Sequence, residues 1–251
     1  MRFVPAVLAV SIGILAVVPA LAQQQTAAQE ETWAQAWERR LHEDFAYLSR
    51  YRDENAKLTP AAGKPRIVFM GDSITEGWVG KDPAFFTPGR IGRGISGQTT
   101  SQMLLRFRQD VIDLHPEVVQ IMAGTNDVAG NTGPATDQQI QANIRSMVEL
   151  AHAHGIRVIL ASIPPAGDFP WKPGLTPGPR IAKLNEWLRS YAAESGSIYA
   201  DYWSALREGV AFHTGWSSDG VHPNEQGYAV MDKVAEAAIG RALKLPKSTK
   251  R

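Results

Sequence analysis

The chain has 251 residues, of which 26 are basic and 25 are acidic, and it contains no cysteine. This length predicts one α/β domain with short additions. The absence of cysteine excludes a thiol nucleophile, a disulfide framework and thiolate zinc sites. A charge balance near zero gives no reason to expect nucleic acid or an anionic membrane surface as a partner.

The first 22 residues have the pattern of a secretory signal peptide. Arg2 precedes an apolar run over residues 3–21, and Ala20-Leu21-Ala22 is an A-x-A cleavage pattern. We therefore expect an exported chain, periplasmic or secreted, with no membrane contact after cleavage. The apolar run also approaches the length of a spanning helix, so a retained N-terminal anchor is the alternative.

Residues 23–60 are expected to form a polar leader followed by an amphipathic helix over roughly 31–55. Apolar side chains recur there at spacings of four and three: Trp33, Trp37, Leu41, Phe45 and Leu48. This periodicity predicts a helix that packs one face on the core. The main domain is expected to span residues 61–245.

Strands and helices alternate through that domain. The predicted strands are near 66–70, 90–91, 117–122, 156–163 and 197–200. The predicted helices begin near Ser73 and cover 100–114, 137–154, 180–195 and 224–243. Most of these strands are continuous apolar runs, which is typical of a parallel sheet covered on both faces. Right-handed crossovers then place every strand-to-helix loop at one edge of the sheet.

Ser73 lies where the first of these strands gives way to a helix, in the stretch Gly71-Asp72-Ser73. Ligands bind at the carboxyl ends of parallel strands, and anions at helix N-termini. A serine in this place is therefore a candidate nucleophile. Serine is also a common helix cap, which is the alternative interpretation of the same segment.

The candidate base is His222, in the stretch 218–224 before the last helix. Of the six histidines, only this one has an acid held close by the local chain, because a turn through Gly220 can fold Asp219 back onto the imidazole. A carboxylate there would fix the tautomer of the ring and stabilise the imidazolium. The alternative is that the two side chains only shape the turn.

Four sequence blocks in this order resemble the SGNH (GDSL) hydrolase superfamily: GDS at 71–73, glycine in the block at 92–97, GTND at 124–127 and DGVHPN at 219–224. The resemblance runs from about 66 to 240. It is closest to platelet-activating-factor acetylhydrolase-like proteins and to bacterial esterases that act on small acyl groups. The fold it implies is a three-layer α/β/α sandwich with a central parallel five-stranded, flavodoxin-like sheet.

The same resemblance implies the roles of five residues. Ser73 would be the nucleophile, His222 the base and Asp219 its orienting acid. The oxyanion hole would consist of the backbone N–H groups of Ser73 and Gly94 and the side-chain amide of Asn126. Neutral donors of this kind stabilise an oxyanion without lowering the pKa of the base.

Some residues fit other interpretations. Gly92 stands where many relatives have Asn. Residues 92–97 also match G-x-G-x-x-G, with Asp113 downstream, so a dinucleotide-binding protein is a rival hypothesis. A non-catalytic glycan-binding module is a third. Asp72 and Asp127 are expected to brace their turns. We expect no cofactor, and no metal because no histidine–carboxylate cluster has ligand spacing.

Aromatic side chains near the expected site bear on the substrate: Trp78, Phe169, Trp171 and Trp216, with Trp203 and Phe212 close by in sequence. Their faces suit sugar rings as well as acyl chains. With export, this favours an esterase for short acyl groups, such as acetyl, on a small-molecule or glycan ester. The alternative is a lysophospholipase or thioesterase with a longer acyl pocket. The sequence does not indicate the oligomeric state.

Overall fold

The computed structural model describes residues 31–59 and 63–246. Two compact units divide the chain, residues 1–39 and residues 40–251. The predicted signal peptide at 1–22 lies outside the described residues. Among the helices of the described ranges, none is long and apolar enough to cross a membrane.

The helix predicted over 31–55 is broken into α1, Trp33–Glu43, and α2, Arg52–Lys57. The carboxylate of Asp44 accepts hydrogen bonds from the backbone N–H groups of Leu48 (2.7 Å) and Ser49 (2.9 Å). An acid that binds amides ahead of it stabilises a turn rather than a helix. The helix therefore ends just before Asp44.

The aromatic stripe predicted for this segment does not form one continuous helix face. The side chains of Trp33 and Phe45 are 62% and 39% exposed. Trp33 instead stacks on Trp37 with ring centroids 5.6 Å apart. The apolar residues would share one face only in a continuous helix, and the turn at Asp44 interrupts that helix.

Five parallel strands form the central sheet, as predicted. They are β1 Ile67–Gly71, β2 Arg90–Gly94, β3 Val118–Ile121, β4 Arg157–Ala161 and β5 Ile198–Ala200. The order is β2-β1-β3-β4-β5, the flavodoxin-like order, with Ile67 opposite both Arg90 and Val118. Every residue of β1 and β3 is buried, which explains their continuous apolar sequence.

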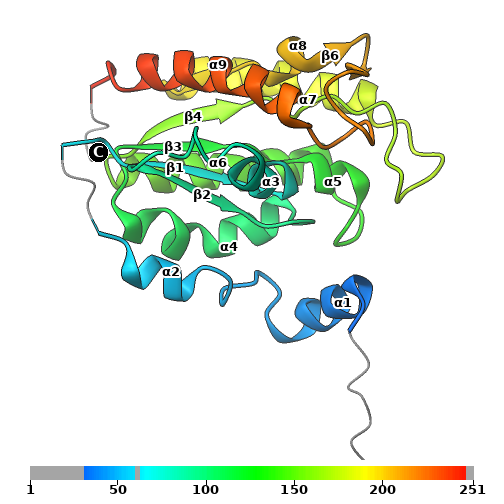
Figure 1. Ribbon diagram of the computed structural model, residues 1–251, viewed down its shortest axis with the longest axis horizontal. Helices are drawn as coiled ribbons and strands as arrows, with labels where there is room; N and C mark the ends of the chain where they lie inside the picture. Colours follow the sequence, from blue (N-terminus) through cyan, green and yellow to red (C-terminus); the bar gives the residue numbers. More distant parts are fainter. Residues whose placement is uncertain (1–30, 60–62, 247–251) are drawn as a thin grey trace, which may run out of the picture. The chain divides into compact units, whose positions relative to one another are not determined.

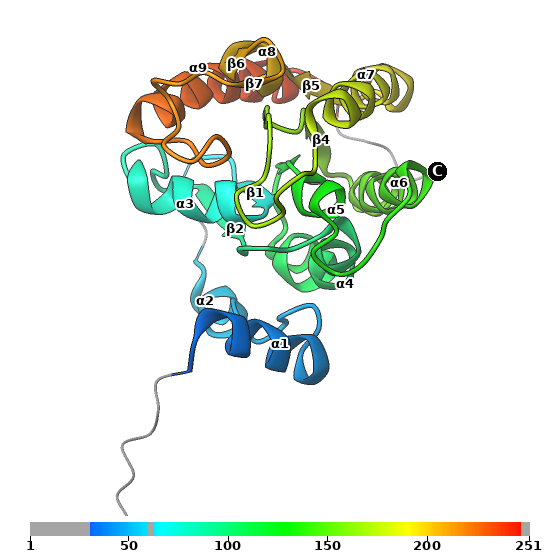
Figure 2. The same cartoon turned by 90° about the vertical axis from the view of Figure 1, so that its right-hand side faces the viewer.

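Helices cover both faces of the sheet. They are α3 Ser73–Lys81, α4 Thr100–Asp110, α5 Thr125–Ala129, α6 Asp137–Ala153, α7 Gly178–Ser195, α8 Tyr202–Leu206 and α9 Glu225–Ala242. One hydrophobic cluster joins the sheet to α4, α6 and α7, and the other joins it to α3, α8 and α9. Figures 1 and 2 show these layers. The three-layer α/β/α prediction is confirmed. The short helices α5 and α8 and the hairpin of β6 (Arg207–Glu208) and β7 (Ala211–Phe212) were not predicted.

The expectation that Trp78 lines the substrate site is wrong, because its side chain is 0% exposed. It lies in the aromatic core under α3, where it stacks on Phe85 at 4.8 Å and meets Phe69 edge-on at 5.6 Å. Its indole N–H donates to the Asp232 carboxylate over 2.9 Å. A buried Trp that satisfies its only donor in this way is a packing residue.

The segment before β1 belongs to the same compact unit as the sheet, the unit of residues 40–251. We call residues 44–58 the strap. Side chains of the domain hold its backbone: Gln98 Nε2 donates to the Ala46 carbonyl over 2.7 Å, and Gln102 Nε2 donates to the Phe45 carbonyl over 2.6 Å. The strap in turn caps β2, since its Tyr51 hydroxyl donates to the Gly94 carbonyl.

Candidate active site

Ser73 is the first residue of α3 and follows the carboxyl end of β1. The helix is capped by Asp72, whose carboxylate accepts the Ile74 N–H over 3.0 Å. Gly71 permits this tight turn, because a Cβ there would lie 2.1 Å from the Thr75 hydroxyl oxygen. The cap is thus the aspartate, and the Ser73 hydroxyl is left for another partner.

That partner is His222. Its Nε2 lies 2.8 Å from the Ser73 Oγ, and its Nδ1 lies 2.7 Å from Oδ2 of Asp219. The three residues therefore form one hydrogen-bonded chain, although Ser73 and His222 are 149 positions apart in the sequence. A carboxylate can only accept, so Nδ1 carries the ring proton and Nε2 accepts from the serine hydroxyl.

The loop 217–222 presents Asp219 to the ring. Its Oδ1 accepts the backbone N–H groups of Val221 (2.9 Å) and His222 (2.8 Å). Burial raises the pKa of Asp219, but these bonds and the ring of His222 outweigh it and lower the pKa to about 2. The Ser217 hydroxyl accepts the Gly220 N–H over 3.0 Å and lies 2.8 Å from the His222 carbonyl. The acid is therefore ionised and fixed at neutral pH.

Asn126 lies in α5, directly beyond β3, and is 3% exposed. Its Nδ2 donates to the Gln98 carbonyl over 3.0 Å and makes a long 3.4 Å contact with the Asp72 carboxylate. Its Oδ1 accepts from Asn131 Nδ2 over 2.8 Å. The amide donor thus faces the residue that precedes Ser73. Burial raises the pKa of Asp72 to about 6 against the bond from Ile74 N–H.

Gly94 does not present its N–H toward Ser73, contrary to the resemblance-based expectation. Ile95 N–H donates to the Gly71 carbonyl, so the odd-numbered residues of β2 pair with β1. In an extended strand the N–H and C=O of the next residue point to the opposite side. The Gly94 carbonyl accordingly meets the Tyr51 hydroxyl at the outer edge of the sheet. Its N–H faces that edge as well.

The structure gives Gly94 a packing role instead. A Cβ there would lie 2.1 Å from the Glu76 backbone nitrogen and 2.6 Å from the Asp72 carbonyl oxygen. Only glycine lets β2 approach the first turn of α3 so closely. Gly92 is similar, since a Cβ would lie 2.2 Å from a Val79 methyl. Two glycines of the G-x-G-x-x-G pattern are therefore strand residues packed on α3, which does not fit a phosphate-binding loop.

A third glycine of that block, Gly97, lies on the Asn126 side. The Gln98 N–H donates to the Ile95 carbonyl over 3.3 Å and closes a turn in which Gly97 has φ +79°. Asn131 Nδ2 lies 3.3 Å from the Gly97 carbonyl, and the next carbonyl, that of Gln98, accepts from Asn126. The turn's closing bond leaves the Gly97 N–H free to donate elsewhere. Its signal in the sequence was a glycine three residues after the end of β2, at a turn position that needs positive φ.

Asp127 was expected to brace its own turn, but the partner of its carboxylate is Thr100, on another element. Its carboxylate accepts the Thr100 hydroxyl over 2.6 Å and the Thr100 N–H over 2.9 Å, at the start of α4. Burial raises the pKa of Asp127 despite these two bonds. The side chain therefore ties α5 to α4 and leaves its neighbour Asn126 to face Ser73.

One aromatic residue of the predicted set stands beside the Ser73–His222 pair. The Trp171 ring is 39% exposed and its centroid lies 6.2 Å from that of His222. Phe169 was expected at the surface of the site, but it is 0% exposed and supports Trp171 from below, with centroids 5.0 Å apart. Trp216 stacks on His213 at 4.2 Å and is partly buried.

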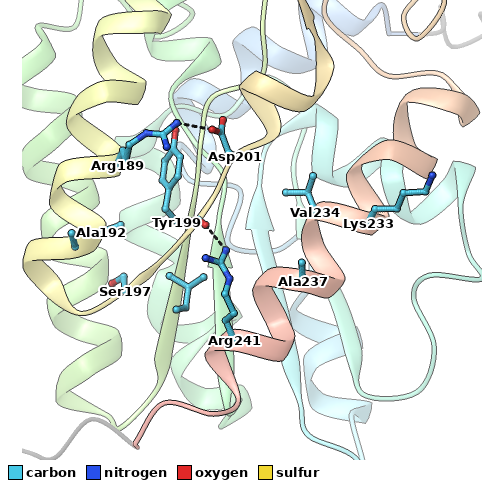
Figure 3. A pocket seen from close by; sticks show the side chains of 11 residues that line it. Arg189, Ala192, Ser197, Tyr199, Asp201, Lys233, Val234, Ala237 and Arg241 are labelled. Atoms are coloured by element: carbon cyan, nitrogen blue, oxygen red, sulfur yellow. Dashed lines mark hydrogen bonds and ion pairs between the residues drawn. The ribbon is translucent and has the colours of Figure 1, made fainter.

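A separate pocket lies between α7, β5 and α9, away from these residues (Figure 3). Its charged side chains are largely engaged: Arg189 pairs with Asp201 at 2.6 Å and Arg241 donates to the Tyr199 carbonyl over 2.8 Å. Across the ranges 31–59 and 63–246, no group of three or more potential ligands is arranged to hold a metal ion.

The chain was compared with known proteins. The model of the GDSL-like Lipase/Acylhydrolase family matches residues 69–230. A GDSL-like lipase from Bacteroides thetaiotaomicron has a similar structure, with a TM-score of 0.76, 46% identity, and coverage of 79% of this chain and 100% of that one.

Two curated esterases are also similar. Esterase TesA from Pseudomonas aeruginosa is 28% identical over 189 residues, which cover 66% of this chain and 83% of that protein. The multidomain esterase of Ruminococcus flavefaciens is 27% identical over 227 residues, which cover 70% of this chain and 28% of that protein. The chain spans no more than about a third of two of the curated relatives that it matches (32% and 28%). The family match covers more than half of the chain and includes Ser73, Asn126, Asp219 and His222. The resemblance to SGNH (GDSL) hydrolases is thereby confirmed, and the chain belongs to the GDSL-like lipase/acylhydrolase family.

Proposed function

We propose that the chain is a serine ester hydrolase that works through an acyl-enzyme on Ser73. The observation that carries this is the hydrogen-bonded chain from the Ser73 hydroxyl to His222 (2.8 Å) and on to Asp219 (2.7 Å). A serine becomes nucleophilic when a neutral base lies within hydrogen-bond reach and a third group orients that base. Membership of an acylhydrolase family supports the same reaction.

The reaction proceeds in two halves. His222 Nε2 takes the hydroxyl proton as Ser73 Oγ attacks the ester carbonyl, and Asp219 stabilises the imidazolium. The imidazolium then protonates the leaving alcohol. Water, deprotonated by the same nitrogen, attacks the acyl-enzyme; the bond from the acyl carbon to Ser73 Oγ then breaks, the acid leaves, and the imidazolium returns the proton to Oγ. The oxyanion formed in each half is assigned to the backbone N–H of Ser73 and the Nδ2 of Asn126. Gly97 N–H is a better-placed third donor than that of Gly94.

Hydrolysis of p-nitrophenyl acetate tests the assignment. Ser73→Ala and His222→Ala are expected to abolish turnover while thermal unfolding stays close to that of the wild type. Ser190→Ala and His154→Ala, at exposed positions of α7 and at the end of α6, are the matched controls and should retain full rate. Near-wild-type turnover by Ser73→Ala or His222→Ala would overturn the proposal.

For the substrate we propose a short acyl group, acetyl above all, on a small-molecule or carbohydrate alcohol. The exposed face of Trp171 beside His222 supports a ring-shaped alcohol, because aromatic faces stack on sugar rings. The competing function is a lysophospholipase or thioesterase. Rates on p-nitrophenyl esters from two to twelve carbons decide between them: we expect kcat/KM to fall with length, and a maximum at eight carbons or more would favour the longer pocket.

Export is part of the proposal, and its support is the A-x-A pattern at 20–22. N-terminal sequencing of the protein made in a bacterial host should find Gln23 first. An intact N-terminus in the membrane fraction would instead support an anchor.

A further inference from the structure

Asn131 follows α5 and lies between three parts of the candidate active site. Its backbone N–H donates to the Asn126 carbonyl over 3.0 Å, which places it on the same turn. Its Nδ2 lies 2.8 Å from Asn126 Oδ1 and 3.3 Å from the Gly97 carbonyl, and its Oδ1 lies 3.3 Å from the Trp171 indole nitrogen. One partly buried side chain thus contacts the amide, the glycine turn and the aromatic face.

Two contacts fix which end of the Asn126 amide lies toward Asp72: the Gln98 carbonyl can only accept, so it takes a bond from Nδ2, and Asn131 donates to Oδ1. A side-chain amide can present its oxygen or its NH₂ in a given direction. Together these contacts turn the Nδ2 of Asn126 toward Gln98 and Asp72. A flipped Asn126 would place an oxygen where negative charge develops, and would oppose the reaction rather than assist it.

Trp171 and the Gly97 carbonyl together fix which end of Asn131 faces Asn126. An indole N–H can only donate. Asn131 therefore presents its oxygen to Trp171, and its NH₂ is left for Asn126. The Trp171 ring is held by its stack on buried Phe169, so the loop after β4 contributes to the orientation of Asn131 and, through it, of Asn126.

We propose that Asn131 is a positioning residue that links Trp171 to the oxyanion-binding amide of Asn126. This rests on the proposed function. An alcohol group that packs on Trp171 keeps the indole N–H on Asn131 and thereby keeps the Asn126 amide oriented for the transition state. A substrate whose alcohol group packs on Trp171 should therefore have a higher kcat, in addition to any lowering of KM.

The test is steady-state kinetics with an acetyl ester of a sugar and with p-nitrophenyl acetate. Asn131→Ala should lower kcat by about 10- to 100-fold with KM little changed, less than the loss of a complete oxyanion donor. Asn131→Asp should lose more, because a carboxylate accepts and cannot donate to Asn126 Oδ1. Gln138→Ala, at an exposed position of α6, is the control with unchanged kcat.

Trp171 offers a pair of variants that separates the link from simple contact. Trp171→Phe keeps a ring on Phe169 but loses the N–H, so it should lower kcat with KM nearly unchanged. Trp171→Ala should lower kcat and also raise KM for the sugar ester. The two Trp171 variants test the link between Trp171 and Asn126 even if Asn131→Ala does not fold.

A double-mutant cycle gives the decisive outcome. If Asn131 acts through Asn126, adding Asn131→Ala to Asn126→Ala should cost no further activity. Fully additive losses, or a Trp171→Phe variant with wild-type kcat, would overturn the proposal. These outcomes are separate from failure of the proposed function, which would appear as Ser73→Ala retaining its turnover.

Discussion

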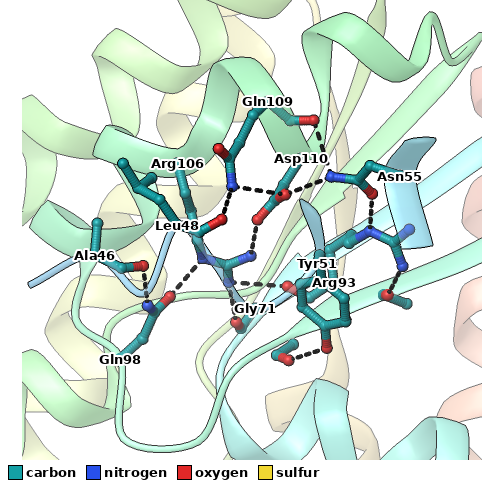
Figure 4. A network of polar contacts seen from close by, with 12 residues as sticks. Ala46, Leu48, Tyr51, Asn55, Gly71, Arg93, Gln98, Arg106, Gln109 and Asp110 are labelled. Carbon is teal, nitrogen blue, oxygen red and sulfur yellow. Dashed lines mark hydrogen bonds and ion pairs between the residues drawn. The ribbon is translucent and has the colours of Figure 1, made fainter. Parts of the chain in front are cut away.

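The guanidinium of Arg106 donates a 2.9 Å hydrogen bond to the carbonyl of Gly71, the last residue of β1. The same Nη2 lies 2.9 Å from the Arg93 carbonyl, and Nε donates to the Gln98 side chain over 2.5 Å. The carboxylate of Asp110 lies 3.1 Å from Nη1 of Arg106 and balances its charge (Figure 4). The side chains of Arg106 and Asp110 are both 0% exposed. One buried cation therefore holds together the ends of β1 and β2 and the turn that carries Gln98.

Arg106→Met is expected to destabilise the domain by about 3–5 kcal/mol, because it leaves Asp110 charged and buried without its partner. Arg106→Lys should recover part of the stability but less of the activity, since an ammonium lacks the planar set of donors that reaches four acceptors. Urea unfolding and kcat measure the two effects. Arg108→Met on the exposed face of α4 is the control. An Arg106→Met protein as stable as wild type would show that this network contributes little.

The two glycines of the second block should behave differently. Gly94→Ala should fail to fold or lose much stability, because its Cβ would lie 2.1 Å from the Glu76 backbone nitrogen. Gly97→Ala should cost about 1 kcal/mol of stability, since alanine is strained at φ +79°, and should lower kcat by disturbing the turn beside Asn126. Thermal unfolding and kcat distinguish the two. A Gly94→Ala enzyme with wild-type stability would contradict the packing role of Gly94.

Asp72 predicts a pH dependence of stability. Burial raises its pKa from 3.8 to about 6, so the folded protein resists ionisation that the unfolded chain undergoes. This carboxyl group therefore costs no stability below pH 3.8, and its cost grows as pH rises to about 6, reaching about 3 kcal/mol at most. Asp72→Asn, which can still cap α3, should gain more stability over wild type at pH 8 than at pH 4. Equal differences at the two pH values would contradict this.

The sequence was enough to predict the parallel sheet, and the four blocks that resemble SGNH hydrolases predicted the pairing of Ser73 with His222 and Asp219. Apolar strands and a local D-x-x-H turn are short-range signals, and the crossover rule brings their ends together. Gly94 was misassigned because strand pairing, which is not visible in a motif, decides where an N–H points. Trp78 was misplaced for a related reason: proximity to Ser73 in sequence says nothing about which face of α3 it occupies.

Long-range polar contacts were also outside the reach of sequence. Arg106 and Asn131 lie in ordinary helical and loop sequence, and only the fold shows that one meets Gly71 and the other Asn126. The spacing of apolar residues predicted a continuous helix through Asp44, but the chain turns there. The Asp44 carboxylate accepts the N–H groups of Leu48 and Ser49, and these local bonds stabilise the turn against the helix.

Asp219→Ala should lower kcat less than Ser73→Ala or His222→Ala does, because the nucleophile and base remain and only their orientation is lost. The variant also releases the Val221 and His222 N–H groups that Asp219 accepts, so the loop should become more susceptible to proteolysis. Kinetics and limited proteolysis at pH 8 check both effects. Wild-type kcat in Asp219→Ala would remove this acid from the mechanism.

Covalent labelling tests the central claim most directly. Diethyl p-nitrophenyl phosphate transfers a diethylphosphoryl group to a serine that is activated by a neighbouring base. Intact-mass and peptide mass spectrometry of the treated protein should find one such group, on the peptide that contains Ser73, together with loss of ester hydrolysis. Ser73→Ala should remain unlabelled. Labelling of another residue, or full activity with Ser73 modified, would contradict the account.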